Sequence, residues 1–200
     1  MQLHISNATI HINMAANDAG LALFTKGELM TKEPSITDGA LTPPAMGEYW
    51  PGQGGHYICT LPALLGMPAR HLIAGADEAE ELTFGPYQEI EGTGSHIDGA
   101  ANTTALLKSA DKHPAAQWAN AYTADGHTDF FLPSRYDLLM AYLCAPKLFN
   151  ASGWYWSSTQ YSRSSAFVQD FENGGSYWGS KDYEHRVRAF RVIPLQTFCA

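Results

Sequence analysis

From residue 150 onward, short aromatic runs alternate with clusters of Gly, Ser and Asn, and this alternation constrains the fold more than any other feature. The runs are WYWSST at 154–159, AFVQDF at 166–171, GSYWGS at 175–180 and RVRAFRVI at 186–193. Aromatic and β-branched residues favour strands, whereas Gly, Ser and Asn favour turns. The last quarter of the chain is therefore predicted to form sheet and loops with little helix.

Two helical segments are predicted before this region. Asn102 or Thr103 can cap the first, whose apolar residues keep helical spacing to about residue 121, with an interruption or kink before Pro114. The second starts after Pro133, with Ser134 as N-cap and Asp137 at the third helical position, which is the acidic form of a capping box. The residues expected on its inner face are Leu138, Leu139, Tyr142 and Leu143.

The first 45 residues differ from the rest of the chain. Residues 1–13 alternate apolar and polar side chains, with a slip of phase at Ser6–Asn7 that predicts two short strands around a turn or bulge. Residues 31–47 are rich in Pro, Gly, Ser and Thr, as linkers are. We therefore divide the chain into an N-terminal β arm with a linker, 1–45, and a domain, 46–200, with early strands at His56–Thr60 and Arg70–Ala74.

The charge distribution argues against binding of nucleic acid. The formal net charge is −8, and no Lys or Arg occurs from Leu72 through Leu107. A nucleic-acid-binding domain normally carries a basic face. The acidic run in this span is expected to be a solvated face, and a non-catalytic Ca²⁺ site stays open as the alternative. Its members are Asp77, Glu78, Glu80, Glu81, Glu89, Glu91 and Asp98.

The sequence contains no motif of a common catalytic or metal site. Cys59, Cys144 and Cys199 are far apart, so at most one disulfide could form and buried free thiols are expected. The eight histidines are scattered, the glycine loop 52–55 is not followed by Lys-Ser/Thr, and no GxSxG string occurs. We expect no enzyme activity, no catalytic residue, no metal ligand and no cofactor.

The amino terminus, MQLHISNATI, lacks the basic and apolar regions of a signal peptide. The longest apolar run, Leu138 to Ala145, is much shorter than the ~20 residues that a membrane-spanning helix needs. Synthesis in a cytoplasm without a signal peptide is therefore expected, with no insertion into a membrane.

Seven sequence motifs, in order, resemble the Lcl C-terminal domain family, which is named for a collagen-like bacterial adhesin and occurs in bacteria and phages. They are PGQGGHYI, DGAANTTALL, PAAQWANAY, GHTDFFLPSRYDLL, YWSST, AFVQDFENG and RVRAFR, and they extend from about Gly47 to Pro194. The resemblance implies an α+β, C-type-lectin-like fold, in which two helices pack on a twisted, mostly antiparallel sheet with long loops. The family often has an aromatic or aliphatic residue at His127 and Trp at Phe130, and residues 1–45 lie outside the resemblance.

The residues of the family motifs have expected physical roles. A turn is expected at Gly126, where glycine permits a positive φ, with Asp129 bonding nearby amides. Trp156 is expected in the core. Gln169 is expected to be a buried hydrogen-bonding residue, with ligand contact as the alternative. Arg188 and Arg191 are expected to pair with carboxylates or carbonyls inside the domain.

The non-motif residues of the late strands are expected to form an exposed surface. Tyr, Trp, Arg, Ser and Asn are the residue types that make adaptable recognition surfaces. Closure of the sheet and contact within an oligomer are the alternatives. The candidate ligand-binding residues are Tyr161, Arg163, Ser164, Asn173, Ser176, Tyr177, Trp178, Lys181 and Tyr183.

These features together predict a non-catalytic recognition module. The resemblance to an adhesin family and the separate N-terminal arm favour a phage or phage-derived tail-tip or fibre protein that contacts a bacterial cell-surface glycan or protein. Residues 1–45 would attach it to other virion or tail proteins or to sister chains, and a homo-oligomer on the particle surface is expected. A structural decoration or tail-assembly component and a retroelement-diversified target-binding protein are the alternatives.

Overall fold

A computed structural model describes residues 2–5, 8–11 and 41–195, and the chain divides into two units between Leu41 and Thr42. In the first unit, strands β1 (Gln2–Ile5) and β2 (Ala8–His11) form an antiparallel pair in which Leu3 lies opposite Ile10. The two short strands predicted on either side of Ser6–Asn7 are therefore confirmed. Residues 196–200, including Cys199, lie outside the described residues.

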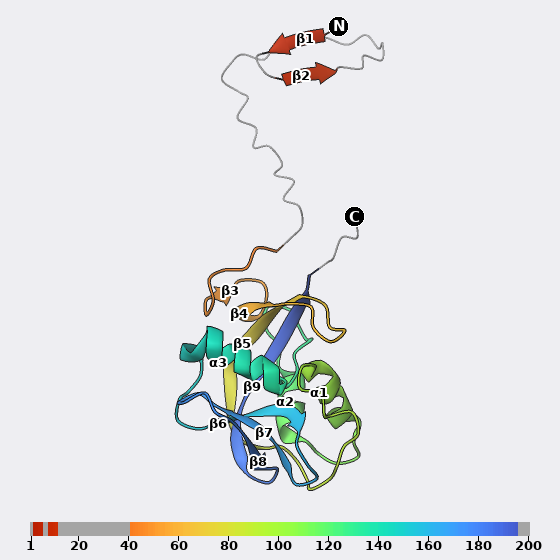
Figure 1. Cartoon of the computed structure of the whole chain (residues 1–200), viewed down its shortest axis with the longest axis vertical. Helices are drawn as coiled ribbons and strands as arrows, with labels where there is room; N and C mark the ends of the chain where they lie inside the picture. Colours follow the sequence, from red (N-terminus) through yellow and green to blue (C-terminus); the bar gives the residue numbers. More distant parts are fainter. Residues whose placement is uncertain (1, 6–7, 12–40, 196–200) are drawn as a thin grey trace. The chain divides into compact units, whose positions relative to one another are not determined.

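The second unit is built on one mixed sheet of seven strands in the order β3-β4-β5-β9-β6-β7-β8 (Figure 1). All neighbouring strands are antiparallel except β6 and β9, which pair in parallel at Tyr155 and Arg186. The mostly antiparallel sheet that the family resemblance implies is confirmed. The strands are β3 (Tyr49–Trp50), β4 (Gly55–Leu61), β5 (Arg70–Thr83), β6 (Trp154–Gln160), β7 (Ser165–Asp170), β8 (Ser176–Ser180) and β9 (Glu184–Pro194).

Three α-helices occur within residues 41–195, where two were predicted: α1 (Gly99–Lys108), α2 (Pro114–Ala121) and α3 (Arg135–Cys144), with a short 3₁₀ helix, η1 (Pro146–Leu148). The first predicted helix is divided because Ser109 is extended and Pro114 begins a new helix. Proline lacks an amide N–H and is favoured at a first helical position. The cap of α1 also differs from the prediction, because Asp98 accepts a 2.9 Å hydrogen bond from the amide of Ala101.

The capping box of α3 is confirmed, but its predicted inner face is partly wrong. The Ser134 hydroxyl accepts from the Asp137 amide at 3.2 Å, and the Asp137 carboxylate accepts from the Ser134 amide at 2.8 Å. Leu138 is buried, whereas Leu139 and Leu143 are 36% and 63% exposed. The buried face instead runs through positions 138, 141 and 145, a spacing that also matches a helical period.

Helices cover both faces of the sheet. One core cluster packs α3 against β4, β6 and β7 and includes Tyr155, and the other packs α1 and α2 against β5, β6 and β9 and includes Trp156. Because Tyr155 and Trp156 are consecutive on β6, they point to opposite faces. Trp156 is fully buried, as predicted, and its indole N–H donates to the carbonyl of Leu82 at 2.8 Å.

This architecture is α+β. None of the helices in the described part of the chain has the length and apolar character that crossing a bilayer would require. Cys59 is buried, Cys144 is half-buried, and both are free thiols, as expected.

Candidate recognition surface

Two of the predicted ligand-binding residues, Tyr177 and Trp178, are consecutive on β8 and lie on opposite faces of the sheet. β8 lies at the edge of the sheet and pairs only with β7, with Trp178 opposite Phe167 and Tyr177 opposite Val168. Since side chains alternate along a strand, Tyr177 and Trp178 point away from each other. The structure therefore contains two aromatic surfaces where one was predicted.

The first, which we call the Trp178 surface, consists of His96, Arg135, Tyr161, Phe167, Ser176 and Trp178. The rings of Tyr161 and Trp178 are stacked, with centroids 5.7 Å apart and planes 9° from parallel. They are 56% and 58% exposed. Phe167 is half-buried beneath them and meets the Tyr161 ring edge-on at 5.3 Å. Two large rings are thus displayed to solvent on a supporting ring.

Arg135 connects this surface to the first turn of α3. Its guanidinium carbon lies 4.3 Å from the centroid of the Phe167 ring, and its Nε donates to the Ser176 hydroxyl at 2.9 Å. The Arg135 amide donates to the Thr159 hydroxyl at 3.1 Å. His96 approaches Phe167 with a centroid distance of 5.3 Å. The supporting ring is therefore held by contacts from α3 and the loop before α1.

Arg163 and Ser164 are exposed in the tight turn between β6 and β7. The amides of Tyr161 and Ser162 both donate to the carbonyl of Ser165 at 3.0 Å, which closes the turn. Arg163 Nε donates to the Tyr87 carbonyl at 3.1 Å. The arginine thus ties the turn to the loop that follows β5.

The second surface, which we call the Trp154 surface, consists of Trp154, Tyr177 and His185. The Trp154 and Tyr177 rings are stacked at 5.5 Å, and His185 lies 5.7 Å from Trp154. Burial lowers the pKa of His185 to about 4, so its imidazole is neutral at pH 7. An open cavity of about 190 Å³ adjoins this surface. Its lining is Glu80, Glu81, Ser152, Gly153, Trp154, Glu184, His185 and Arg186.

Lys181 does not belong to either surface, contrary to the prediction. It is fully buried, and its Nζ donates to the Gln88 carbonyl at 2.5 Å and to Gln160 Oε1 at 2.6 Å. Burial lowers the pKa of Lys181 to about 8. This lysine fastens the loop after β5 to the end of β6, which is a structural role.

Asn173 and Tyr183 lie in the turns before and after β8. The Asn173 side-chain oxygen accepts from the Gly175 amide at 2.9 Å, and the Tyr183 amide donates to the Ser180 carbonyl at 3.0 Å. Tyr183 is 61% exposed. Both residues are available to solvent, but they are not members of the two ring clusters.

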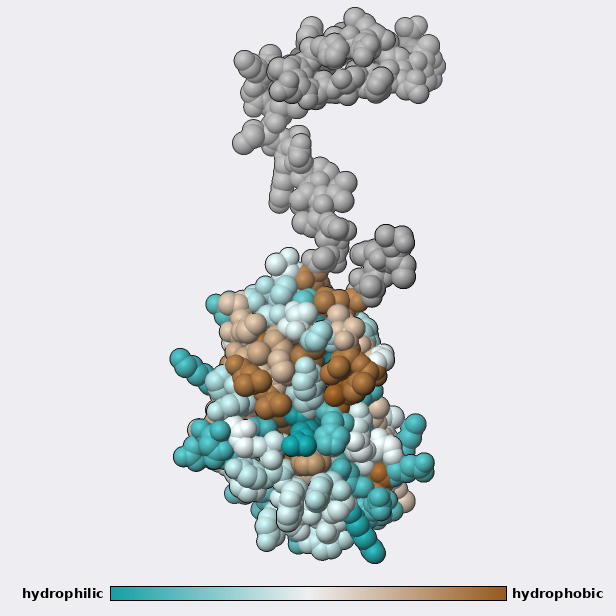
Figure 2. Space-filling model, in the orientation of Figure 1, coloured by the Kyte–Doolittle hydropathy of each residue, from teal (hydrophilic) through white to brown (hydrophobic). Residues whose placement is uncertain are grey.

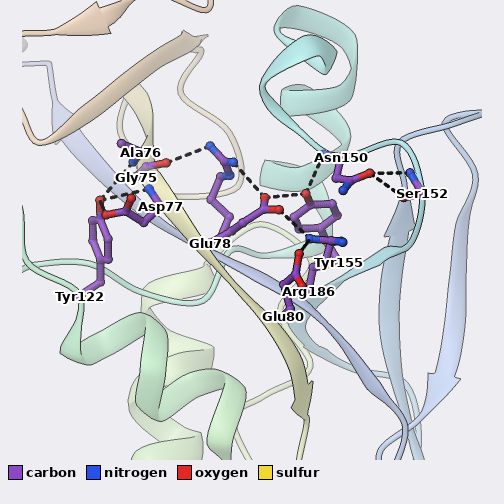
Figure 3. Close-up of polar contacts among 11 residues, drawn as sticks. Gly75, Ala76, Asp77, Glu78, Glu80, Tyr122, Asn150, Ser152, Tyr155 and Arg186 are labelled. Carbon is purple, nitrogen blue, oxygen red and sulfur yellow. Dashed lines mark hydrogen bonds and ion pairs between the residues drawn. The ribbon is translucent and has the colours of Figure 1, made fainter.

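Part of the acidic run forms ion pairs, so the prediction that the run is a solvated face is only partly correct. Glu78 accepts from Tyr155 at 2.6 Å and from Arg186 and Arg188 at 2.9 Å each (Figure 3). Burial alone would raise the pKa of Glu78, but these hydrogen bonds and positive charges outweigh it and lower the pKa. Glu80 also pairs with Arg186. Within residues 41–195, no group of three or more His, Cys, Asp or Glu is placed to hold a metal ion.

Other family residues lie mostly as expected. Arg191 pairs with Asp129 at 2.6 Å and Arg188 with Glu78, so both arginines act inside the domain. Gln169 is buried and donates to the Asp170 carbonyl at 3.0 Å. Gly126 has a φ of +81°.

Asp125, rather than Asp129, bonds the nearby amides. Its Oδ2 accepts from the amides of Gly52 and Gly54 and from the hydroxyl of Tyr49. The Gly54 amide, the Tyr49 hydroxyl and the Gly52 amide together lower the pKa of Asp125. The carboxylate thereby fixes the glycine loop before β4.

The distribution of exposed aliphatic residues separates the two ends of the domain. In the view of Figure 2, apolar surface gathers over α3 and over the loop between β4 and β5, whereas the surface over β6–β8 is of intermediate hydropathy. The exposed aliphatic residues of these two regions include Leu64, Leu65, Leu139 and Leu143. The β6–β8 region therefore displays rings among small polar residues rather than aliphatic side chains.

Comparison with known proteins adds little to this geometry. No protein-family model matches the chain, and no curated protein matches it. A fimbrial protein from Bacteroides ovatus, known from a crystal structure, is similar with a TM-score of 0.47 and 13% sequence identity. The likeness covers 62% of this chain and 36% of that chain, so the chain spans about a third of the fimbrial protein.

Proposed function

We propose that this chain is a non-catalytic recognition module and that the Trp178 surface is its binding surface. The observation that carries the proposal is the stacked, exposed pair of Tyr161 and Trp178. Exposing two large rings is unfavourable in water, and such rings are frequent at the centres of binding interfaces. Their support by Phe167 and Arg135 fixes the rings before a ligand arrives, which reduces the entropy lost on binding.

The biological setting of the proposal comes from the motif resemblance. A C-type-lectin-like domain of the Lcl type suits a receptor-binding protein at the tail tip or fibre of a phage or phage-derived particle. Its target would be a bacterial surface glycan or protein. Residues 1–45 would join it to other virion proteins or to copies of itself.

The proposal is tested by binding of the fluorescently labelled full chain to a panel of bacterial cells. Trp178→Ala and Tyr177→Ala form a matched pair, because each removes an exposed ring from the same edge strand but from opposite faces. We expect Trp178→Ala to reduce binding at least tenfold and Tyr177→Ala to retain it. Loss in Tyr177→Ala alone would transfer the function to the Trp154 surface, and no binding by the wild type to any cell would reject the proposal.

A structural role in a particle is the second candidate, and the exposed aliphatic residues favour it. Leu65 is 83% exposed and Leu143 is 63% exposed, which suits surfaces that a neighbouring subunit covers. Sedimentation of the wild type and of Leu65→Ser and Leu143→Ser variants tests this role. A stable oligomer that either substitution dissociates would support it, and a monomer in all three cases would reject it.

A further inference from the structure

Arg135 is one of three arginines without a carboxylate partner in the described part of the chain; the others are the buried Arg70, which donates to two carbonyls, and the exposed Arg163. Arg186, Arg188 and Arg191 each pair with a carboxylate at the β5–β9 ladder or beside it. Within residues 41–195, Arg135 forms no ion pair, and its hydrogen bond to Ser176 uses only Nε. The two terminal nitrogens of its guanidinium therefore keep their donors available at the edge of the exposed rings.

Among the described residues, Arg163 also keeps its terminal nitrogens free, but it lies in the β6–β7 turn and donates to the Tyr87 carbonyl, whereas Arg135 lies over the Phe167 ring of the Trp178 surface. Carboxylates nearby in sequence, such as Asp137, are directed elsewhere, since Asp137 is buried in the capping box. A guanidinium presents a rigid, planar fork that matches a carboxylate with two parallel hydrogen bonds. The stacking of Arg135 over Phe167 leaves this fork oriented by the ring beneath it.

The exposed rings add a second requirement for the ligand. A pyranose ring has a face of C–H groups, slightly positive, that can pack on the negative face of Tyr or Trp. Its hydroxyl groups then need hydrogen-bond partners at the rim, and Ser176 and His96 stand there beside Arg135. The six residues of the Trp178 surface are aromatic, polar or charged, which suits a sugar ring with hydroxyl groups better than an aliphatic peptide side chain.

We infer that the Trp178 surface binds an acidic saccharide, with a sugar ring against Tyr161 and Trp178 and a sugar carboxylate on the guanidinium of Arg135. This inference rests on the proposed recognition function and narrows its ligand. A nucleic acid would also offer stacking and negative charge, but its dense phosphates would be repelled by the acidic chain. A saccharide with isolated carboxylates places one negative charge against one guanidinium.

The test is titration calorimetry of the full chain with a panel of short uronate and sialylated oligosaccharides. Each is compared with its counterpart whose carboxyl groups are reduced to neutral hydroxymethyl groups. The variants are Arg135→Gln, Arg135→Lys, Trp178→Ala and Arg163→Gln. Arg163→Gln is the matched control, because it removes the same charge from an exposed arginine that is not part of the Trp178 surface.

We expect the wild type to bind at least one carboxylated saccharide tenfold or more tightly than its reduced counterpart. Arg135→Gln should abolish this preference, Arg135→Lys should restore it only in part, and Arg163→Gln should leave it unchanged. Trp178→Ala should weaken binding of both forms. Equal binding of carboxylated and reduced forms across the panel, or a preference that survives Arg135→Gln, would overturn the inference.

The outcomes separate this inference from the proposed function. Cells bound in a Trp178-dependent way, without any preference for carboxylated sugars, would leave the recognition function standing and remove the acidic saccharide. Tight binding to acidic peptides or oligonucleotides instead of saccharides would likewise overturn the ligand class. Cell binding that does not depend on Trp178 would reject the surface itself, and the saccharide inference with it.

Discussion

Glu78→Gln tests whether the ion-pair network between β5, β6 and β9 stabilises the fold. The Glu78 side chain is 20% exposed and serves three donors, including Arg188, whose side chain is only 7% exposed. Glutamine keeps the size and one oxygen for Tyr155 but removes the charge. Breaking a buried ion pair by removing one partner costs about 3–5 kcal/mol, because the other charge stays buried without compensation. We expect a loss of about 3 kcal/mol, the lower end, because Arg186 keeps Glu80.

The assay is urea unfolding followed by tryptophan fluorescence, with thermal unfolding alongside it. For a domain of this size, 1 kcal/mol corresponds to roughly 2–4 °C, so the melting temperature should fall by about 10 °C. Glu80→Gln is the control, since its side chain is 63% exposed and an exposed pair contributes roughly 0–1 kcal/mol.

The pH dependence gives a second check on the same network. The pKa of Glu78 is lower in the folded chain than its ordinary value of 4.5. Its charge therefore stabilises the fold above pH 4.5, and this contribution is lost as pH falls through the folded pKa. The difference between the wild type and Glu78→Gln should shrink below pH 4.5. A loss under 1 kcal/mol at pH 7, or an equal loss in Glu80→Gln, would refute the reasoning.

Three further predictions concern the core and its titrating groups. Because the pKa of Lys181 is lowered to about 8, the unfolded chain binds more protons above that pH, so the free energy of unfolding should rise as pH increases beyond 8. Lys181→Met should lack this rise and lose about 1–3 kcal/mol, because the Gln88 carbonyl loses its donor while Gln160 Oε1 keeps only the amide of Ile90. Burial raises the pKa of Cys59 to about 12, so iodoacetamide at pH 8 should leave its peptide unmodified in the native chain and label it in urea, as read by mass spectrometry. Gly55→Ala would place a Cβ 2.2 Å from the Ala74 carbonyl oxygen and should cost about 3 kcal/mol or more, whereas Gly94→Ala meets open space and should change the free energy of unfolding by less than about 0.5 kcal/mol.

The elements predicted correctly are those whose sequence signals lie in neighbouring residues. The capping box at Ser134 and the aromatic strands after residue 150 were found because their determinants lie within a few positions of each other. The start of α1 was placed too late, since Asn102 and Thr103 looked like caps but are buried in the helix. The strand order could not be predicted, because β9 inserts between β5 and β6 through pairings distant in sequence.

For the candidate site too, only residues with a signal in the local sequence could be predicted. Tyr161, Ser176 and Trp178 could be selected because they are aromatic or small polar residues outside the family motifs. Arg135 and Phe167 were missed as surface residues because both lie inside motifs whose roles were assigned to folding. Lys181 was wrongly placed at the surface, since its acceptors, the Gln88 carbonyl and Gln160 Oε1, are distant in sequence and nothing next to Lys181 marks it as buried.

The edge position of β8 has a consequence for how such a protein can change over generations. A strand with one neighbour needs its backbone to pair on one side only, so the outward side chains of Tyr177 and Trp178 can be replaced without disturbing the interior. Gly179 is the exception, because a Cβ there would lie 3.0 Å from His185 Nε2 and 3.3 Å from the Trp156 ring. Substitutions at positions 177 and 178 would therefore each alter a different face of the sheet, whereas a larger residue at position 179 would require the His185 and Trp156 rings to shift.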